Sequence, residues 1–214
     1  MRVKPQTKKL LKKSWRQKLS FLTNISKRNK KAIGIASLVV LLILSLFGMY
    51  KNYMEAQNTE IEKTVVHYYM AMDNKDMDEL KNVIYPDNKD YTDSFIMDVQ
   101  SKMLVTKFES IKVDTIYPAL IDGNIAIVGY RATTKSNLNS PSLITFQEIG
   151  TSVLKKKGDR WYIAKPIDLQ NISSDYLNEF FNKYQKVLKE NITEEDAEHV
   201  VNSQKALFSL LAKQ

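Results

Sequence analysis

The chain has 214 residues, a formal net charge of +8 and no cysteine. Without cysteine it forms no disulfide and offers no thiolate nucleophile, no cysteine-bound zinc and no lipid attachment through cysteine. Residues 1–31 hold 12 of the basic residues and no acidic one, which leaves 20 basic against 24 acidic side chains in the remainder. The positive charge therefore belongs to one end of the chain, and it gives no reason to expect a nucleic-acid partner for the rest.

Residues 32–50 form an uncharged, apolar run of 19 residues. At ~1.5 Å per residue, a helix of this length reaches roughly 28 Å, close to the ~30 Å hydrocarbon core of a bilayer. A core helix of a globular protein shows a polar face, and a signal peptide has a shorter apolar region followed by a small-residue cleavage site. The run has neither feature, so the sequence predicts a retained transmembrane helix over residues 32–50.

The charges on the two sides of this run predict its orientation. The positive-inside rule places residues 1–31 in the cytoplasm and the chain from about residue 51 onward outside, with Tyr50 and Tyr53 as aromatic anchors at the outer interface of the membrane. In residues 8–25, apolar residues recur at helical spacing among basic ones, which favours a helix lying on anionic lipid headgroups. A tail whose charges only set the topology, or one that binds a cytoplasmic partner, remains an alternative. The expected lipid-interface residues of this head are Lys8, Lys9, Lys12, Lys13, Trp15, Arg16 and Lys18.

The helical period returns outside the membrane. A first helix is expected over residues 58–72 and a third over residues 92–104, because apolar residues recur there with the helical period. Between them, Asp76 is expected as the N-cap of a second helix, with Glu79 as its capping-box partner, and Pro86 ends that helix. The expected organisation is a cytoplasmic head at residues 1–31, the membrane helix, a linker at residues 51–57, one domain over residues 58–170 and C-terminal helices over residues 171–214.

The hydrophobic period then changes to that of strands. Asp122 and Gly123 are a strong hairpin signal, because glycine tolerates the positive φ that a tight turn needs. A second hairpin turn is expected at residues 156–159, beyond which Trp161 and Ile163 would point to one face of the sheet. The expected strands cover residues 108–121 with a break near Pro118, residues 124–134, residues 143–155 after a polar loop at residues 135–142, and residues 160–166.

Two further amphipathic helices are expected at the C-terminal end of the chain. Ser174 is expected to cap the first, and Thr193 with Asp196 to open the second. From the sequence, these helices either pack on the domain or pair as a hairpin outside it.

Helices followed by a four-stranded meander that ends in a Gly-x-x-Trp hairpin resemble the fold of the nuclear transport factor two-like superfamily, which includes ketosteroid isomerase. The resemblance implies an α+β fold: a cone-shaped domain of helices packed on a curved antiparallel sheet, here after a transmembrane helix and before C-terminal helices. That fold hosts enzymes, binding modules and scaffolds, so it does not decide function. The resemblance covers about residues 58–168 and rests on Tyr69, Met72, Asp76, Leu80, Ile84, Pro86 and residues 158–163.

The order of a basic cytoplasmic head, one membrane helix and one such domain outside is also similar to the inner-membrane assembly component of type IV secretion and conjugation systems. It further resembles Gram-positive conjugative-transfer proteins of that design. Related membrane-proximal domains occur in some penicillin-binding proteins, where the resemblance implies a spacer role.

The sequence offers little chemistry for an enzyme. An isomerase-like site would need a carboxylate base and a tyrosine or protonated acid in an apolar cone. Tyrosines on a half-buried sheet usually belong to the core, and helix capping explains the acidic residues at residues 73 and 76. The two histidines lie 132 positions apart, and no nucleotide-binding or hydrolase motif is present, so we expect neither a metal nor a cofactor. The pocket candidates are Tyr69, Asp73 and Tyr130, with Tyr117 as a further tyrosine of the sheet.

Two functional hypotheses follow. The favoured one is a non-catalytic scaffold that recruits other envelope proteins, or further copies of itself, through the outer domain, as in a conjugative-transfer machine. The other is a membrane-tethered small-molecule-binding or isomerase-like domain, or a cell-wall-associated spacer. The absence of a recognisable constellation of catalytic residues favours the scaffold.

Overall fold

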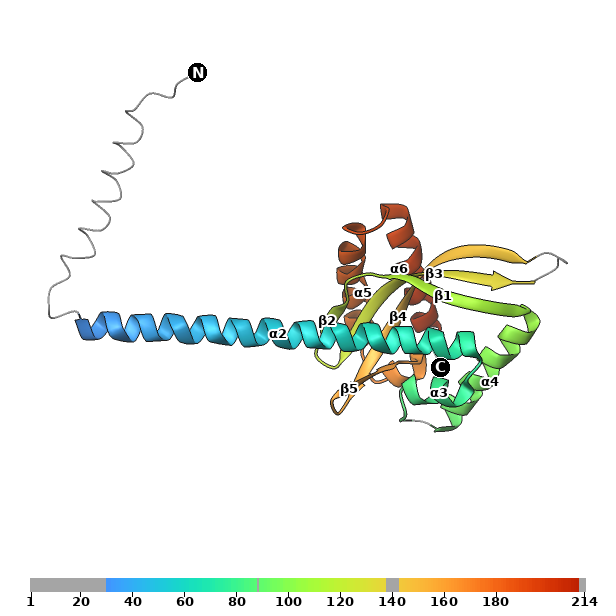
Figure 1. Ribbon diagram of the computed structural model, residues 1–214, viewed down its shortest axis with the longest axis horizontal. Helices are drawn as coiled ribbons and strands as arrows, with labels where there is room; N and C mark the ends of the chain where they lie inside the picture. Colours follow the sequence, from blue (N-terminus) through green and yellow to red (C-terminus); the bar gives the residue numbers. More distant parts are fainter. Residues whose placement is uncertain (1–29, 88, 138–142, 212–214) are drawn as a thin grey trace, which may run out of the picture. The chain divides into compact units, whose positions relative to one another are not determined.

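The computed structural model describes residues 30–87, 89–137 and 143–211. The chain divides into two compact units, Met1–Met54 and Glu55–Gln214. In chain order the elements are α2 (Lys30–Asn74), α3 (Met77–Val83), α4 (Lys89–Val105), β1 (Phe108–Ile116), β2 (Leu120–Asp122), β3 (Ile125–Ser136), β4 (Ile144–Lys157), β5 (Arg160–Ile163), the 3-10 helix η2 (Pro166–Leu169), α5 (Ser174–Lys189) and α6 (Glu194–Leu211) (Figure 1).

The described part of the first unit is the apolar part of α2, and its side chains are exposed throughout residues 37–50. Within the described residues, α2 is the one helix long and apolar enough to cross a membrane. Tyr50 and Tyr53 are exposed on it. The other expected lipid-interface residues, between Lys8 and Lys18, lie outside the part of the chain that the structure describes.

Helix α2 does not stop where the apolar run stops. It continues without a break to Asn74, so residues 51–57, expected as a linker, are helical. These residues include neither glycine nor proline, and lysine, methionine, glutamate, alanine and glutamine are good helix formers. The predicted helix over residues 58–72 is therefore the last part of a longer one.

The second unit begins with that last part of α2. After Asn74 the chain reverses through Lys75, whose φ of +57° lies in the left-handed region. Asp76 caps α3 as predicted, because its carboxylate accepts a hydrogen bond from the backbone N–H of Glu79 at 2.9 Å. Helix α4 corresponds to the expected third helix and begins three residues earlier.

The strands form one antiparallel sheet in the order β1-β3-β4-β5, and β2 pairs with the end of β3 that β1 does not reach. The predicted break near Pro118 separates β1 from β2. Both predicted hairpin turns are confirmed, and Gly123 and Gly158 have φ of +61° and +60° there. The second turn is shorter than predicted, because Lys156 and Lys157 belong to β4 and pair with β5.

Side chains alternate between the two faces of the sheet. One face, which we call the α2 face, packs against α2 and carries Ala126, Val128, Tyr130 and Ala132. The opposite face, which we call the α5–α6 face, packs against the two C-terminal helices and carries Ile125, Ile127 and Val153. Helices α3 and α4 form a third cluster around Leu80, Ile84 and Ile96. The unit is thus the predicted α+β fold of helices packed on a curved antiparallel sheet, and helices cover both faces of that sheet (Figure 1).

The C-terminal helices pack on the sheet and on each other, so the first of the two arrangements left open by the sequence is the correct one. Tyr184 of α5 is fully buried, and its hydroxyl oxygen accepts a hydrogen bond from the backbone N–H of Gly129 in β3. Position 129 has no room for a side chain, because a Cβ there would lie 2.9 Å from both Tyr184 Oη and Leu188 Cδ2.

The capping residues of these helices differ from the prediction in one place. Ser173, not Ser174, caps α5, and its hydroxyl accepts a hydrogen bond from the backbone N–H of Tyr176 at 3.2 Å. Thr193 and Asp196 lie at the start of α6 as predicted, with Thr193 Oγ1 accepting from the Asp196 backbone N–H at 3.2 Å.

Candidate functional site

Two of the three pocket candidates meet between α2 and the sheet. The rings of Tyr69 on α2 and Tyr130 on β3 pack against each other, with centroids 4.7 Å apart. Both side chains are buried, at 7% and 9% exposure. The ring of Tyr68 meets the Tyr69 ring edge-on at 5.1 Å. The α2 face therefore holds a small cluster of three tyrosines.

Gly150 of β4 makes room for this cluster. It pairs with Tyr130 across the sheet, and a Cβ at position 150 would lie 2.3 Å from Tyr130 Oη and 2.4 Å from Tyr130 Cζ. No real Cβ contact is so short, so the Tyr130 ring lies where a side chain at position 150 would be. An isolated glycine inside a strand pattern signals such a close approach. That signal is present in the sequence, where Gly150 is the one glycine of the predicted strand over residues 143–155.

Glu148 is an acidic residue whose charge acts on Tyr69 and Tyr130. The sequence analysis did not predict it as part of the site. It stands opposite Ala132 in the β3–β4 register, on the α2 face, and its charge opposes ionisation of both Tyr69 and Tyr130. Partial burial raises the pKa of Glu148, although its side chain still reaches solvent. Burial raises the pKa of Tyr130 to about 12 and that of Tyr69 further above its ordinary value. The tyrosines are therefore hydrogen-bond donors over the whole physiological range.

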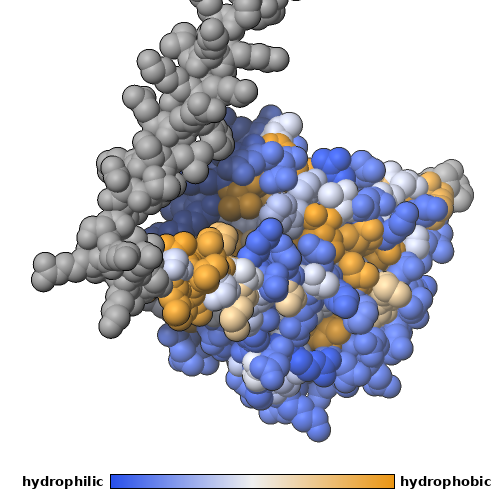
Figure 2. All heavy atoms as spheres, turned by 60° about the vertical axis from the view of Figure 1, so that its left-hand side comes forward, coloured by the Kyte–Doolittle hydropathy of each residue, from blue (hydrophilic) through white to orange (hydrophobic). Residues whose placement is uncertain are grey.

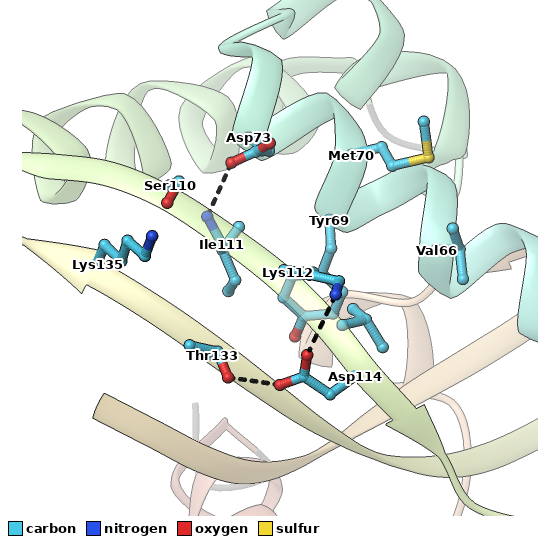
Figure 3. Close-up of a pocket in the computed structure, with 11 residues that line it drawn as sticks. Val66, Tyr69, Met70, Asp73, Ser110, Ile111, Lys112, Asp114, Thr133 and Lys135 are labelled. Carbon is cyan, nitrogen blue, oxygen red and sulfur yellow. Dashed lines mark hydrogen bonds and ion pairs between the residues drawn. The ribbon is translucent and has the colours of Figure 1, made fainter. Parts of the chain in front are cut away.

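Asp73, the third candidate, does not join this cluster. Its Oδ1 accepts a hydrogen bond from the backbone N–H of Ile111 at 2.8 Å, as Figure 3 shows. Strand β1 is an edge strand, so this N–H has no strand partner and the carboxylate satisfies it. Asp73 thus fastens the end of α2 to the edge of the sheet.

A pocket of about 530 Å³ lies along the edge strand β1, next to Asp73, and its lining comes from both sides of that strand (Figure 3). Its polar groups are largely engaged with one another: Asp114 accepts from Thr133 Oγ1 at 2.5 Å and lies 3.9 Å from Lys112 Nζ. Its lining consists of Val66, Tyr69, Met70 and Asp73 from α2, residues 110–114 from β1, and Thr133 and Lys135 from β3. Tyr130 is not among these residues, so the pocket and the tyrosine cluster share only Tyr69.

A buried ion pair lies between β5 and the helices. Lys165 is 4% exposed, and its Nζ lies 3.4 Å from Asp168 Oδ2 while donating to the Tyr85 carbonyl at 2.9 Å and to Thr92 Oγ1 at 3.0 Å. Burial lowers the pKa of the lysine and raises that of the aspartate. These contacts join the start of η2 to Tyr85, which lies between α3 and α4, and to Thr92 of α4.

The remaining sequence candidates do not converge on a site. Tyr117 belongs to the core on the α5–α6 face, away from Tyr69 and Tyr130. Within the described residues, no group of three or more His, Asp and Glu side chains is placed to hold a metal. Lys155, Lys156 and Lys157 form a basic run at the end of β4. Two of them are paired: Lys156 Nζ donates to Gln57 Oε1 and Lys157 Nζ to Asp87 Oδ1, each at 2.7 Å.

Hydrophobic side chains also reach the surface of the second unit. Figure 2 shows hydrophobic patches among hydrophilic ones on the face turned to the viewer. Exposed large apolar residues outside the apolar part of α2 include Met70, Tyr91, Met97, Leu104, Val105, Leu143, Ile144 and Phe146.

Comparison with known proteins gives a likeness of fold. No protein-family model matches the chain, and no curated protein matches it in sequence. A protein of the NTF2-like family from Streptomyces avermitilis is 14% identical, with a TM-score of 0.40 over 51% of this chain and 93% of that one. An NTF-2-like protein of unknown function from Shewanella oneidensis is 15% identical, with a TM-score of 0.36 over 50% and 98% of the two chains. A conserved protein from Planctomyces limnophilus is 12% identical, with a TM-score of 0.41 over 52% and 95%.

Proposed function

We propose that the protein is a non-catalytic, single-pass membrane protein whose Glu55–Gln214 unit scaffolds a complex of envelope proteins. The apolar run of α2 anchors it, residues 1–31 lie in the cytoplasm on anionic lipid, and the C-terminal unit lies outside, in keeping with the charge asymmetry. A conjugative-transfer or type IV secretion-like machine is the complex that this architecture resembles.

The observation that carries the proposal is that the tyrosine cluster is used for packing. Tyr130 lies over Gly150 and packs against Tyr69 of α2, which covers this part of the sheet. Asp73 is likewise engaged with a backbone N–H. Groups that could serve chemistry are thus engaged in holding the fold, while apolar side chains remain at the surface, where partner proteins bind.

The scaffold predicts which changes matter. Asp73→Asn keeps an acceptor for the Ile111 N–H, and Tyr130→Phe keeps the ring, so both variants should retain function near wild type. Deleting residues 1–54 should abolish it, because a scaffold held in the membrane gains an effective concentration that a free unit lacks. Recovery of neighbouring membrane proteins by pull-down and rescue of a deletion strain measure this. Severe loss in a folded, correctly located Tyr130→Phe protein would contradict the scaffold, as would full rescue by the anchorless unit.

A second candidate is a membrane-tethered binding or isomerase-like domain. It is favoured by the packed rings of Tyr69 and Tyr130 and by Glu148 on the same face of the sheet, whose raised pKa suits a general base. Glu148→Gln should then remove proton exchange at the carbon next to a carbonyl in an apolar ketone, followed by NMR in deuterated water. Exchange at the rate of buffer alone in the wild-type protein would dismiss this candidate.

A further inference from the structure

Strand β4 has a free edge along half of its length. It pairs with β3 from Ile144 to Lys155, but β5 covers its other side only at residues 154–157. Figure 1 shows the distal part of the β3–β4 hairpin extending past α5 and α6. Within the described residues, no strand pairs with the outer side of residues 144–150.

The direction of the backbone groups on this edge follows from two hydrogen bonds. The Thr151 carbonyl accepts from Gln204 Nε2 at 3.2 Å, and the Val153 carbonyl accepts from the Ala164 N–H at 2.8 Å, so both carbonyls point away from β3. Backbone groups alternate in direction along a strand, and the β3–β4 register has no bulge. The N–H and C=O groups of Thr145 and Gln147 therefore also point outward.

The side chains beside this edge are suited to pairing. Ile144 and Phe146 lie on the α2 face, and each is 44% exposed. A row of unpaired backbone groups flanked by exposed apolar side chains is a template for an added strand. Folded proteins usually block such an edge with charge, proline or a covering element, whereas residues 144–149 contain no proline and a single charged residue, Glu148.

The opposite side of the same edge is basic. Arg131 and Lys135 stand on β3 on either side of Thr133, which pairs with Gln147 of β4. Neither cation has a carboxylate within ion-pair distance in the described part of the chain. An added strand would lie two strand spacings from β3, roughly 10 Å, which a long basic and a long acidic side chain can span together.

We propose that the outer edge of β4, residues 144–149, binds an extended segment of another protein in which acidic and apolar residues alternate. The apolar residues of that segment lie beside Ile144 and Phe146, and its acidic residues point to the side of Arg131 and Lys135. This inference rests on the proposed scaffold function and names the chemistry of its partner.

A second copy of the chain fits this edge less well. Its own β4 edge offers Glu148 as the one acidic residue of positions 144–149, and Glu148 lies on the α2 face. Paired with a copy of itself, the edge would bring a second Arg131 and Lys135 to the basic side, with no acidic side chain for either. Charge complementarity therefore favours a different protein.

The test uses the full-length protein in nanodiscs of zwitterionic lipid. The probe is a blocked nine-residue peptide that alternates valine with glutamate, and the control peptide carries lysine in place of glutamate. We expect the glutamate peptide to bind saturably, at least about tenfold more tightly than the lysine peptide, and to slow hydrogen exchange in residues 144–150. Replacing both Arg131 and Lys135 by glutamate should reverse the preference between the peptides.

The edge itself is tested by Gln147→Pro. Because the N–H of residue 147 points outward, proline there removes one donor for the added strand and no bond of the β3–β4 ladder. Affinity should fall about three- to tenfold, while Gln147→Thr, which keeps the N–H, should bind as wild type. Equal binding by both variants, or no binding of the glutamate peptide, would overturn the proposal. A third outcome would also overturn the proposal: the wild-type protein self-associates, Gln147→Pro abolishes that self-association, and the peptide does not bind. The occupant of the edge would then be a second copy of the chain. Rescue by the anchorless unit, by contrast, would refute the scaffold and leave peptide binding unaffected.

Discussion

Gly150→Ala tests how tightly the tyrosine cluster is packed. The added Cβ would lie 2.3 Å from Tyr130 Oη, and the ring cannot move freely because Tyr69 packs against it with centroids 4.7 Å apart. Overpacking of a core typically costs about 1–3 kcal/mol. Alanine in a strand regains roughly 0.5–1 kcal/mol relative to glycine. We therefore expect a net loss of about 1–2 kcal/mol in the free energy of unfolding.

The same substitution should change sign when the ring is absent. In a Tyr130→Ala background nothing opposes the new methyl group, so Gly150→Ala should stabilise by roughly 0.5–1 kcal/mol. Urea unfolding of wild type, both single variants and the double variant measures the coupling between the two positions. The unit Glu55–Gln214 serves for this, and we expect it to fold alone because it has its own core. An equal effect of Gly150→Ala in both backgrounds would refute the packing of Tyr130 over Gly150.

Three further predictions concern the core, alkaline pH and topology. Trp161 is 3% exposed, and its Nε1–H donates a hydrogen bond to Gln57 Oε1 at 2.8 Å. Trp161→Ala should therefore lower the free energy of unfolding by roughly 3–5 kcal/mol. A melting temperature within a degree or two of wild type would show that the ring is not part of the core. Burial raises the pKa of Tyr130 from 10.0 in the unfolded chain to about 12 in the folded protein. Above pH 10 the unfolded state therefore loses this proton first, and the free energy of unfolding falls by about 1.4 kcal/mol per such tyrosine at pH 11. Tyr130→Phe should remove that share of the loss, and an unchanged alkaline slope in chemical unfolding would argue against it. A reporter fused after Gln214 should be active outside the cytoplasm, with Lys12 inside, and a signal only from the cytoplasm would reverse the orientation.

The sequence predicted the fold where a local signal was strong. Asp122 and Gly123 specified their hairpin, and the capping pattern at Asp76 marked the start of α3, because a turn or a cap depends on a few neighbouring residues. Composition was a weaker guide for residues 51–57: they look like a polar linker, yet nothing in them breaks a helix. The adjacent serines 173 and 174 are equally good caps by type, so one position of error was unavoidable.

The candidate site was less predictable, because it depends on contacts between distant residues. Tyr69 and Tyr130 lie 61 positions apart and meet only when β3 packs beneath α2. Asp73 is expected to cap a helix end, but its carboxylate accepts a hydrogen bond from the Ile111 N–H, a contact 38 positions away that no local pattern indicates. Glu148 carries no sequence signal, since its position depends on the register of β4 against β3.

The packing of α5 and α6 on the sheet, which includes the hydrogen bond from the Gly129 N–H to Tyr184 Oη, affects the order in which the unit folds during synthesis. Every strand is synthesised before α5 and α6, so Ile127 and Val153 emerge with nothing yet available to cover them. A growing chain buries apolar surface in the order in which its segments appear, and exposed apolar surface invites aggregation. The α5–α6 face of the sheet is therefore covered only once α5 and α6 have been made, and a product truncated before Ser174 would keep that face open to water.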